Sequence, residues 1–467
     1  MPLPSTLFKR PGTLRSWACL VFAAILVVLA LDVLSGHGLY SYSSAITGIR
    51  SLAHQELLLV IPATSSNHHL CQLLLSAAVL GYPAPTLINW GAPEDEDDYV
   101  QHLAKVETIL NHLKALPSAR DNDLYFMIDG YDAWFQLPPD ILIQRYHSLV
   151  AKSSQRYPHG NVKDVVIFGQ DKLCWPGSFS RAACWAVPNS TLPIYAFGPD
   201  TDHGIAEHNR PRWLNSGTIM GPVKDVRDVF AATLEMIQTN HTENSDQFYF
   251  ANLFAAQAYA RGPTDLDEWP QGPLPDGEEL EYPNISPGQR TEYGIGIDYE
   301  SAIFQTVAYY EDSITFNTLD HPSSGAQKTE QGVETYYQVA LPPELVSSSP
   351  ADLLKRGKSP PSLDDLPEPL RSWSSVPLGF NTVTKQVFPI LHFTGKKGYR
   401  EMWWHRNWFY PYAENILHRL QQSGGDAPTG KKQRPGVAGV WTTDPASPVL
   451  SWEYLCGRYE DYLFGRR

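Results

Sequence analysis

The sequence lacks an excess of basic residues. Its 467 residues include 36 Lys and Arg against 50 Asp and Glu, which gives a formal net charge of −14. Proteins that bind the nucleic-acid backbone need a basic face, so this balance excludes a general nucleic-acid binder. An acidic protein that binds an anionic ligand must also supply local compensation, either a bound cation or a few lysines and arginines.

Cysteine is scarce as well, with five in the chain. Neither a CxxC pair nor a His/Cys cluster suggests a structural zinc site in the sequence. Cys19 lies in an apolar run, which leaves Cys71, Cys174, Cys184 and Cys456. The ten-residue spacing of Cys174 and Cys184 allows a local disulfide in an oxidising compartment, and two buried free thiols are equally consistent with it.

The chain has one long apolar run, at residues 17–31, and it continues past Asp32. The basic residues that precede the run are Lys9, Arg10 and Arg15. Because positive charge stays cytosolic, we expect a type II single-pass topology, with a cytosolic tail at 1–16, a signal-anchor helix at 17–35 and a stem at 36–54. A cleaved signal is less favoured, because no clear cleavage site follows. The sequons at Asn189, Asn240 and Asn284 are compatible with a body in the lumen of the endoplasmic reticulum or Golgi.

Short apolar runs alternate with helical patterns over the first half of the chain. The expected strands are 57–62, 83–90, 124–128 and 165–169, and the expected helices are 70–80 and 100–116. This alternation predicts an α/β fold with a mixed, mostly parallel sheet flanked by helices.

The second half has a different composition. Residues 262–290 and 321–378 are rich in Pro, Gly, Ser and acidic residues and are expected to be loops or insertions. Between them, 296–318 is predicted to be hairpin-like, followed by a strand at 388–393 and a helix at 401–420 broken at Pro411. We expect one domain at 55–420 and a linker with a C-terminal segment at 421–467. There is no internal repeat.

Two carboxylates follow directly after the predicted strand 124–128, in the sequence Asp129-Gly130-Tyr131-Asp132. In open α/β sheets, ligands bind at the carboxyl ends of the strands. Two carboxylates three positions apart form a hard-oxygen site suited to Mn²⁺ or Mg²⁺, which neutralises a diphosphate. The alternative is a turn that uses Asp and Gly for backbone reasons alone.

A second polar segment, HFTGKK at 392–397, also follows an apolar run. A neutral His392 imidazole can complete a manganese shell. Gly395 permits close backbone approach, and Lys396 or Lys397 can hold a phosphate as a point charge. This segment offers the local positive charge that an acidic protein needs for an anionic ligand.

Six segments in order resemble the glycosyltransferase domain of procollagen lysyl hydroxylases and the related procollagen galactosyltransferases, over roughly residues 55–400. They are FMIDGYDAWF (126–135), VVIFGQDKLCWP (165–176), WLNSG (213–217), SDQF (245–248), DYESAIFQ (298–305) and LHFTGKK (391–397). The last also resembles the His-x-x-Gly-x-Lys motif of glycogenin-like enzymes. The resemblance implies a GT-A fold and a retaining, UDP-sugar-dependent hexosyltransferase that uses a hydroxyl of a protein or glycan as acceptor.

The resemblance also implies roles for particular residues. The Mn²⁺ (or Mg²⁺) ligands would be Asp129, Asp132 and His392. The uridine would lie against Thr64 and Tyr131, and the diphosphate against Gly395, Lys396 or Lys397. The donor-sugar and acceptor side would be lined by Asn215, Asp246 and Gln247, with Asp171 and Trp175 shaping the acceptor pocket. From the residues alone, Asn215-Ser216-Gly217 is an ordinary turn and Asp246 a helix N-cap.

The chain departs from the family in ways that bear on the acceptor. The family's acidic run before Asp246 is here Glu243-Asn244-Ser245, and no His-x-Asp…His iron triad follows, so collagen lysine is not a safe substrate assignment. The alternative function is a catalytically inactive lumenal binding or scaffold protein. A glycoside hydrolase fits poorly, because the two Asp carboxylates are too close together to flank a glycosidic bond.

Overall fold

The computed structural model describes residues 55–92, 98–156, 162–262, 279–320, 323–328, 334–354, 367–423 and 435–466. The expected tail, signal-anchor and stem at 1–54 lie outside these ranges. Within the described ranges, no helix is long and apolar enough to cross a membrane. The described residues from Leu57 onward belong to one compact unit.

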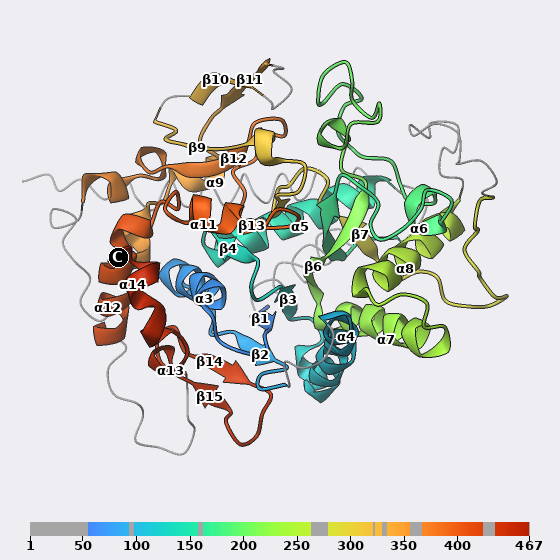
Figure 1. Cartoon of the computed structure of the whole chain (residues 1–467), viewed down its shortest axis with the longest axis horizontal. Coiled ribbons are helices and arrows are strands. Elements are labelled where there is room, and N and C mark those ends of the chain that lie inside the picture. The colour runs from blue at the N-terminus through green and yellow to red at the C-terminus, as the bar shows by residue number, and fades with distance from the viewer. Residues whose placement is uncertain are drawn as a thin grey trace, which may run out of the picture. The chain divides into compact units, whose positions relative to one another are not determined.

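An eight-stranded sheet forms the centre of this unit, with the strand order β15-β14-β2-β1-β3-β6-β5-β7 (Figure 1). The strands are β1 (Leu57–Pro62), β2 (Thr86–Ile88), β3 (Leu124–Ile128), β5 (Val166–Asp171), β6 (Trp213–Pro222), β7 (Ile295–Ile297), β14 (Val440–Thr442) and β15 (Val449–Leu450). Strand β6 runs antiparallel to its neighbours β3 and β5, and β15 runs antiparallel to β14, whereas the other pairs are parallel. The predicted α/β class with a mixed, mostly parallel sheet is confirmed.

Helices cover both faces of the sheet. They are α3 (His68–Leu80), α4 (Asp98–Ala115), α5 (Pro139–Arg156), α7 (Val223–Thr239) and α8 (Asp246–Arg261). Along β3, Phe126 and Ile128 pack in the same core as α3 and α5, while Tyr125 and Met127 pack in the core of α4, α7 and α8. Successive strand residues point to opposite faces, so a continuously apolar strand needs apolar cover on both sides. Full burial of each such side chain contributes about 1.5–3 kcal/mol.

A three-stranded sheet, ordered β4-β13-β8, carries the second polar segment. Its strands are β4 (Ala133–Phe135), β13 (Ile390–His392) and β8 (Phe304–Thr306). In the β4–β13 pairing, His392 lies opposite Ala133, the residue after Asp132. The predicted strand at 388–393 is therefore confirmed in its central part, and its pairing brings together two motifs that are far apart in the chain.

One prediction about the second half is wrong. Residues 296–318 are not a hairpin, because β7 pairs with β5, β8 pairs with β13, and β9 (Ile314–Asn317) pairs with β12 (Leu378–Asn381). The segment 321–378, expected to be loops or an insertion, contains β10 (Ser323–Lys328) paired with β11 (Glu334–Val339), and the helices α9 (Pro343–Val346) and α10 (Pro350–Leu354). Short strands that pair with distant partners leave little local signal in the sequence.

The C-terminal segment packs on the same unit. It follows α11 (Tyr399–Trp404), η8 (Tyr410–Tyr412), which contains Pro411, and α12 (Ala413–Ser423). Strand β14 pairs in parallel with β2, and β15, α13 (Trp452–Cys456) and α14 (Glu460–Leu463) follow it. A Cys71–Cys456 disulfide joins α3 to α13, and a Cys174–Cys184 disulfide closes the short loop before α6 (Ala182–Trp185).

The remaining described elements are short 3-10 turns. They are η1 (Ser118–Arg120), η2 (Ala206–His208), η4 (Glu311–Ser313), η6 (Glu368–Arg371), η7 (Trp373–Ser375) and η9 (Gly457–Tyr459).

Candidate functional site

A cavity of about 630 Å³ opens at the carboxyl-terminal edge of the parallel strands. Its lining comes from the residues that follow β1, β2, β3 and β13, from the end of β5, from the first half of β6, and from the start of α8. The residues of this lining that the sequence singled out are Thr64, Asp129, Tyr131, Asp132, Asp171, Trp175, Asn215, Asp246, Gln247, His392, Gly395 and Lys397. Lys396 is exposed and does not line the cavity.

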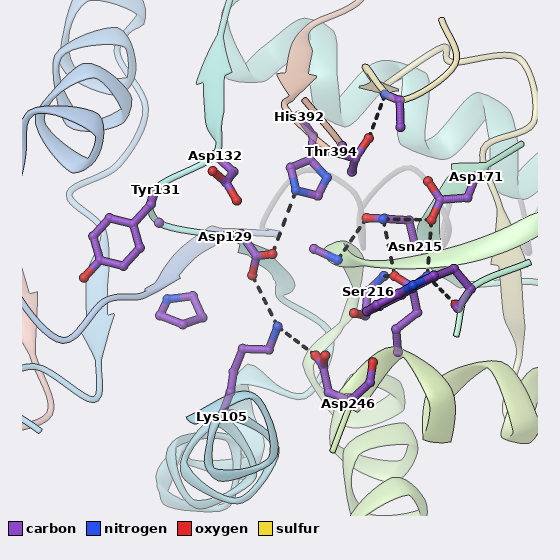
Figure 2. Close-up of a pocket in the computed structure, with 18 of the residues that line it drawn as sticks. Lys105, Asp129, Tyr131, Asp132, Asp171, Asn215, Ser216, Asp246, His392 and Thr394 are labelled. Atoms are coloured by element: carbon purple, nitrogen blue, oxygen red, sulfur yellow. Dashed lines mark hydrogen bonds and ion pairs between the residues drawn. The ribbon is translucent and has the colours of Figure 1, made fainter. Parts of the chain in front are cut away.

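Asp129 and His392 face each other inside this cavity (Figure 2). The Asp129 Oδ2 atom lies 3.8 Å from Nε2 of His392. The Asp129 backbone N–H donates to the carbonyl of Gly217 on β6, at 2.9 Å. A Cβ atom on Gly217 would lie 2.1 Å from Cε1 of His392 and 2.7 Å from Oδ2 of Asp129, so the absence of a side chain there makes room for the pair.

The Asp129–His392 pair has the chemistry of a divalent-cation site. Burial lowers the pKa of His392 to about 4, so its imidazole is neutral at pH 7 and carries a free lone pair. Two ligand atoms 3.8 Å apart can both reach one ion at the usual ligand distance of about 2.1 Å. An imidazole nitrogen beside a carboxylate oxygen is a donor set that Mn²⁺ accepts.

Asp132, the third predicted ligand, does not join this pair. Its Oδ2 accepts from Nζ of Lys397 at 2.5 Å, and its Oδ1 accepts from Nη1 of Arg400 at 2.7 Å. The ligand atoms of Asp129, Asp132 and His392 therefore do not form one group in this structure. Of the two basic side chains in these ion pairs, Lys397 lines the cavity together with Thr394 and Gly395.

Lys105 is a site residue that the sequence analysis missed. Its ammonium lies 3.3 Å from Oδ1 of Asp129 and 2.7 Å from Oδ2 of Asp246, and it bridges α4 to α8 (Figure 2). Burial alone would lower the pKa of Lys105, but the two adjacent carboxylates outweigh it and raise the pKa above its ordinary value. The local sequence does not distinguish Lys105 from other lysines of an amphipathic helix. Only the packing of α4 against the sheet brings it to the site.

Tyr131 holds the loop that follows β1. Its hydroxyl accepts hydrogen bonds from the backbone N–H groups of Thr64 and Ser65, at 3.0 and 3.1 Å, and donates to the Ser65 carbonyl. Gly130 packs closely against Pro62, whose carbonyl would lie 2.5 Å from any added Cβ. The two residues predicted to lie against a base, Thr64 and Tyr131, are thus joined to each other.

A polar network forms the opposite wall of the cavity. The Asp171 Oδ2 atom accepts from the side-chain amides of Asn215 and Gln247, at 3.1 and 3.2 Å. The Gln247 amide also donates to the carbonyl of Trp175, whose indole is 54% exposed. Burial raises the pKa of Asp171 to about 6, although the two amide hydrogen bonds oppose the shift. The network joins β5, β6 and α8. It connects all four of the predicted residues Asp171, Trp175, Asn215 and Gln247 by hydrogen bonds.

Two structural alternatives from the sequence are wrong. Asn215, Ser216 and Gly217 do not form a turn; they lie within the ten-residue strand β6, where Gly217 faces Asp129. Asp246 is the first residue of α8 rather than its N-cap, a position that Ser245 occupies. Gly395 adopts a positive φ of 67°, which supports its predicted backbone role.

The cavity therefore combines the Asp129–His392 pair, the basic side chains of Lys105 and Lys397, and a polar wall beside an exposed tryptophan. This arrangement suits an anionic ligand at one end and a hydroxyl-rich ligand at the other. No protein-family model matches the chain, and no curated protein matches it.

Proposed function

We propose that the chain is a metal-dependent glycosyltransferase of GT-A fold that transfers a sugar from a UDP-sugar to a hydroxyl acceptor. The observation that carries the proposal is the meeting of Asp129 and His392, 263 positions apart, against Gly217 at the carboxyl edge of the sheet. The Lys397 ammonium beside them suits a diphosphate. The strand order, with β6 antiparallel between parallel strands, is compatible with this fold.

Each part of the cavity has a task in this proposal. Asp129 and His392 would hold Mn²⁺ or Mg²⁺, and Asp132, which lines the same cavity, could join them once its ion pairs rearrange. A cation held there would neutralise charge on the UDP leaving group. Lys397 contacts the diphosphate, and the loop fixed by Tyr131 receives the uridine at Thr64. These groups position the donor and stabilise the leaving group, which accounts for most of the catalysis in such transfers.

The polar wall serves the sugar and the acceptor. Asn215 and Gln247 present side-chain amides that are already ordered by Asp171, so few groups must be immobilised when the sugar binds. Trp175 offers an exposed aromatic face for an apolar sugar face. Lys105 holds Asp246 at this wall and orients Asp129 at the same time.

The compartment is part of the proposal. Two disulfides are typical of proteins that fold in the secretory pathway. Of the three sequons, Asn240 and Asn284 are exposed and Asn189 is half-buried, so glycans can be accommodated. These features support a lumenal body, and the apolar run at 17–31 with basic residues before it supports type II anchoring in the Golgi or endoplasmic reticulum membrane.

Turnover of donors tests the proposal. The purified chain is incubated with Mn²⁺ and, in separate reactions, UDP-glucose, UDP-galactose and UDP-N-acetylglucosamine, and released UDP is measured. We expect slow hydrolysis of one donor, its loss in Asp129→Asn, and its retention in Asp200→Asn, which changes an exposed aspartate. If no UDP-sugar is turned over, the scaffold alternative replaces the enzyme.

A further inference from the structure

A second group of metal-binding side chains lies outside the cavity. His68 and His69 begin helix α3, Glu401 lies in helix α11, and one ligand atom from each lies within 4.8 Å of the other two. Among the described residues, this is the one group of three or more His, Cys, Asp and Glu side chains with that spacing. None of the three residues lines the cavity described above.

The His69 ring is oriented as in metal sites. Its Nδ1 lies 3.2 Å from Oε1 of Gln72, a fully buried side chain, and its Nε2 lies 3.2 Å from Oε1 of Glu401. When Nδ1–H donates to the Gln72 oxygen, the Nε2 lone pair faces the carboxylate. Two acceptors at this distance repel each other unless a cation or a proton lies between them. A histidine that binds a metal usually donates its other ring N–H to an acceptor, and Gln72 offers such an acceptor to Nδ1 of His69.

The backbone around the group is held from several directions. Cys71, in the first turn of α3, is bonded to Cys456, and the Tyr459 hydroxyl donates to the Ser66 carbonyl at 3.1 Å. The His68 ring packs edge-on against Tyr462, with 4.6 Å between ring centroids. The side chain of His69 is 12% exposed and that of Glu401 is 46% exposed, so one side of the group is open to an entering ion.

We propose that His68, His69 and Glu401 bind a zinc ion that joins α3 to α11. Two imidazoles and one carboxylate are a zinc ligand set, with water as the fourth ligand. Tetrahedral zinc places its ligand atoms about 3.3 Å apart, a spacing that His69 and Glu401 already have. His68 completes the set by a rotation of its side chain. Softer imidazole ligands favour zinc over the Mn²⁺ of an oxygen-rich site.

The zinc ion has a structural role. Helix α11 begins just after Lys397, and its Arg400 donates to Oδ1 of Asp132 and to the carbonyl of Tyr131. An ion at Glu401 fixes the helix that carries Arg400, and thereby supports the loop beside the cavity. The inference does not depend on the proposed function, because it rests on residues outside that site.

Zinc content tests the inference. The full chain is stripped with EDTA, dialysed against micromolar Zn²⁺, and assayed for zinc per chain by mass spectrometry. We expect the double variant His69→Gln/Glu401→Gln to hold one zinc fewer than the wild type, and His405→Gln, which changes an exposed histidine beyond α11, to hold the wild-type amount. Added zinc should raise the thermal unfolding midpoint of the wild type more than that of the double variant, because only the wild type binds zinc at this site.

Two further measurements distinguish a loss of zinc binding from poor folding of the double variant. Glu401→Gln alone changes a half-exposed side chain, so it reports zinc loss even if the double variant folds poorly. Co²⁺ should give the visible absorption of a tetrahedral site in the wild type and lose it in Glu401→Gln. Equal zinc content in the wild type and both variants would overturn the inference and leave His69 and Glu401 as a hydrogen-bonded pair. Zinc content and the Co²⁺ spectrum are measured without UDP or Mn²⁺, so this test and that of the proposed function can fail independently.

Discussion

At the residue scale, the cavity depends on a single glycine. Gly217 lies against both Asp129 and His392, and an added Cβ would stand 2.1 Å from the imidazole. His392 is buried and paired within β13, and the backbone N–H of Asp129 is bonded to the Gly217 carbonyl, so neither neighbour can move away freely. Gly217→Ala should weaken Mn²⁺-dependent UDP binding tenfold or more, because overpacking of this kind costs about 1–3 kcal/mol.

The control for this substitution is Gly436→Ala, since nothing lies within 4 Å of the added methyl group. Calorimetric titration of UDP in the presence of Mn²⁺ compares the three proteins. Unchanged UDP affinity in Gly217→Ala would show that the Asp129–His392 pair does not hold the cation.

Asp171 gives the structure a predictable pH dependence. Its native pKa of about 6 lies above the unfolded value of 3.8, so well below pH 3.8 the carboxyl is protonated in both states and costs nothing. As the pH rises from 3.8 to 6, the unfolded chain releases a proton that the native state keeps, and stability falls. Asp171→Asn lacks this loss, so relative to the wild type it should gain about 2 kcal/mol between pH 4 and pH 7.

Urea unfolding of Asp171→Asn at pH 4 and pH 7 measures that gain, with Asp200→Asn as an exposed control. A stability difference between Asp171→Asn and wild type that does not change with pH would mean that Asp171 ionises normally. Asp298, whose pKa burial also raises to about 6, adds the same slope to both proteins and therefore cancels in the comparison.

At the element scale, the C-terminal segment is held to the unit by a disulfide of long span. Cys71 and Cys456 are separated by 385 residues and join α3 to α13. Loss of a native disulfide typically costs about 2–5 kcal/mol, and more for longer loops. Cys71→Ser/Cys456→Ser should therefore unfold at lower temperature, with faster hydrogen exchange in β14, β15 and α13.

The matched control is Cys174→Ser/Cys184→Ser, which opens a loop of ten residues and should cost less. A larger loss of stability in this pair than in the first would contradict the view that the long-range disulfide secures the C-terminal segment.

Elements with strong local patterns could be predicted from the sequence, and elements defined by distant partners could not. The apolar strand at 124–128 and the helix that ends at Gly81 agree with the structure, because burial and capping act over a few residues. Strand β14 has three residues, and it exists because β2 offers it an edge. The Cys71–Cys456 disulfide likewise could not be predicted, because its two cysteines are 385 residues apart in the sequence.

The same division applies to the site. The rule that ligands bind at the carboxyl ends of parallel strands placed Asp129 and His392 in one region, and β4–β13 pairing brings them there. Lys105 was missed because its function comes from the packing of α4 against the sheet. The turn expected at Asn215 was wrong because three small or polar residues in a buried strand resemble a loop in composition.

At the scale of the whole molecule, the chain is acidic, yet three basic side chains lie at the carboxylates of the site. The net charge is −14, yet Lys105, Lys397 and Arg400 all pair with carboxylates of the site. These pairs keep the basic groups ordered before an anionic ligand arrives, which lowers the entropy cost of binding.

The membrane topology leads to a prediction about glycosylation of the whole chain. If the body is lumenal, the exposed sequons at Asn240 and Asn284 will carry glycans when the full chain is made in a eukaryotic cell. Endoglycosidase treatment should increase its gel mobility, and Asn240→Gln or Asn284→Gln should each remove one step of the shift. A chain without glycans would contradict the type II topology.

The central claim is that Asp129 and His392 bind a cation that holds a nucleotide diphosphate. Its most direct test is the affinity for UDP, measured by calorimetry with and without Mn²⁺, in the wild type and in Asp129→Asn. We expect at least tenfold tighter UDP binding with Mn²⁺ in the wild type, and no such gain in Asp129→Asn. Equal affinity with and without Mn²⁺ in the wild type, or an undiminished gain in the variant, would contradict it.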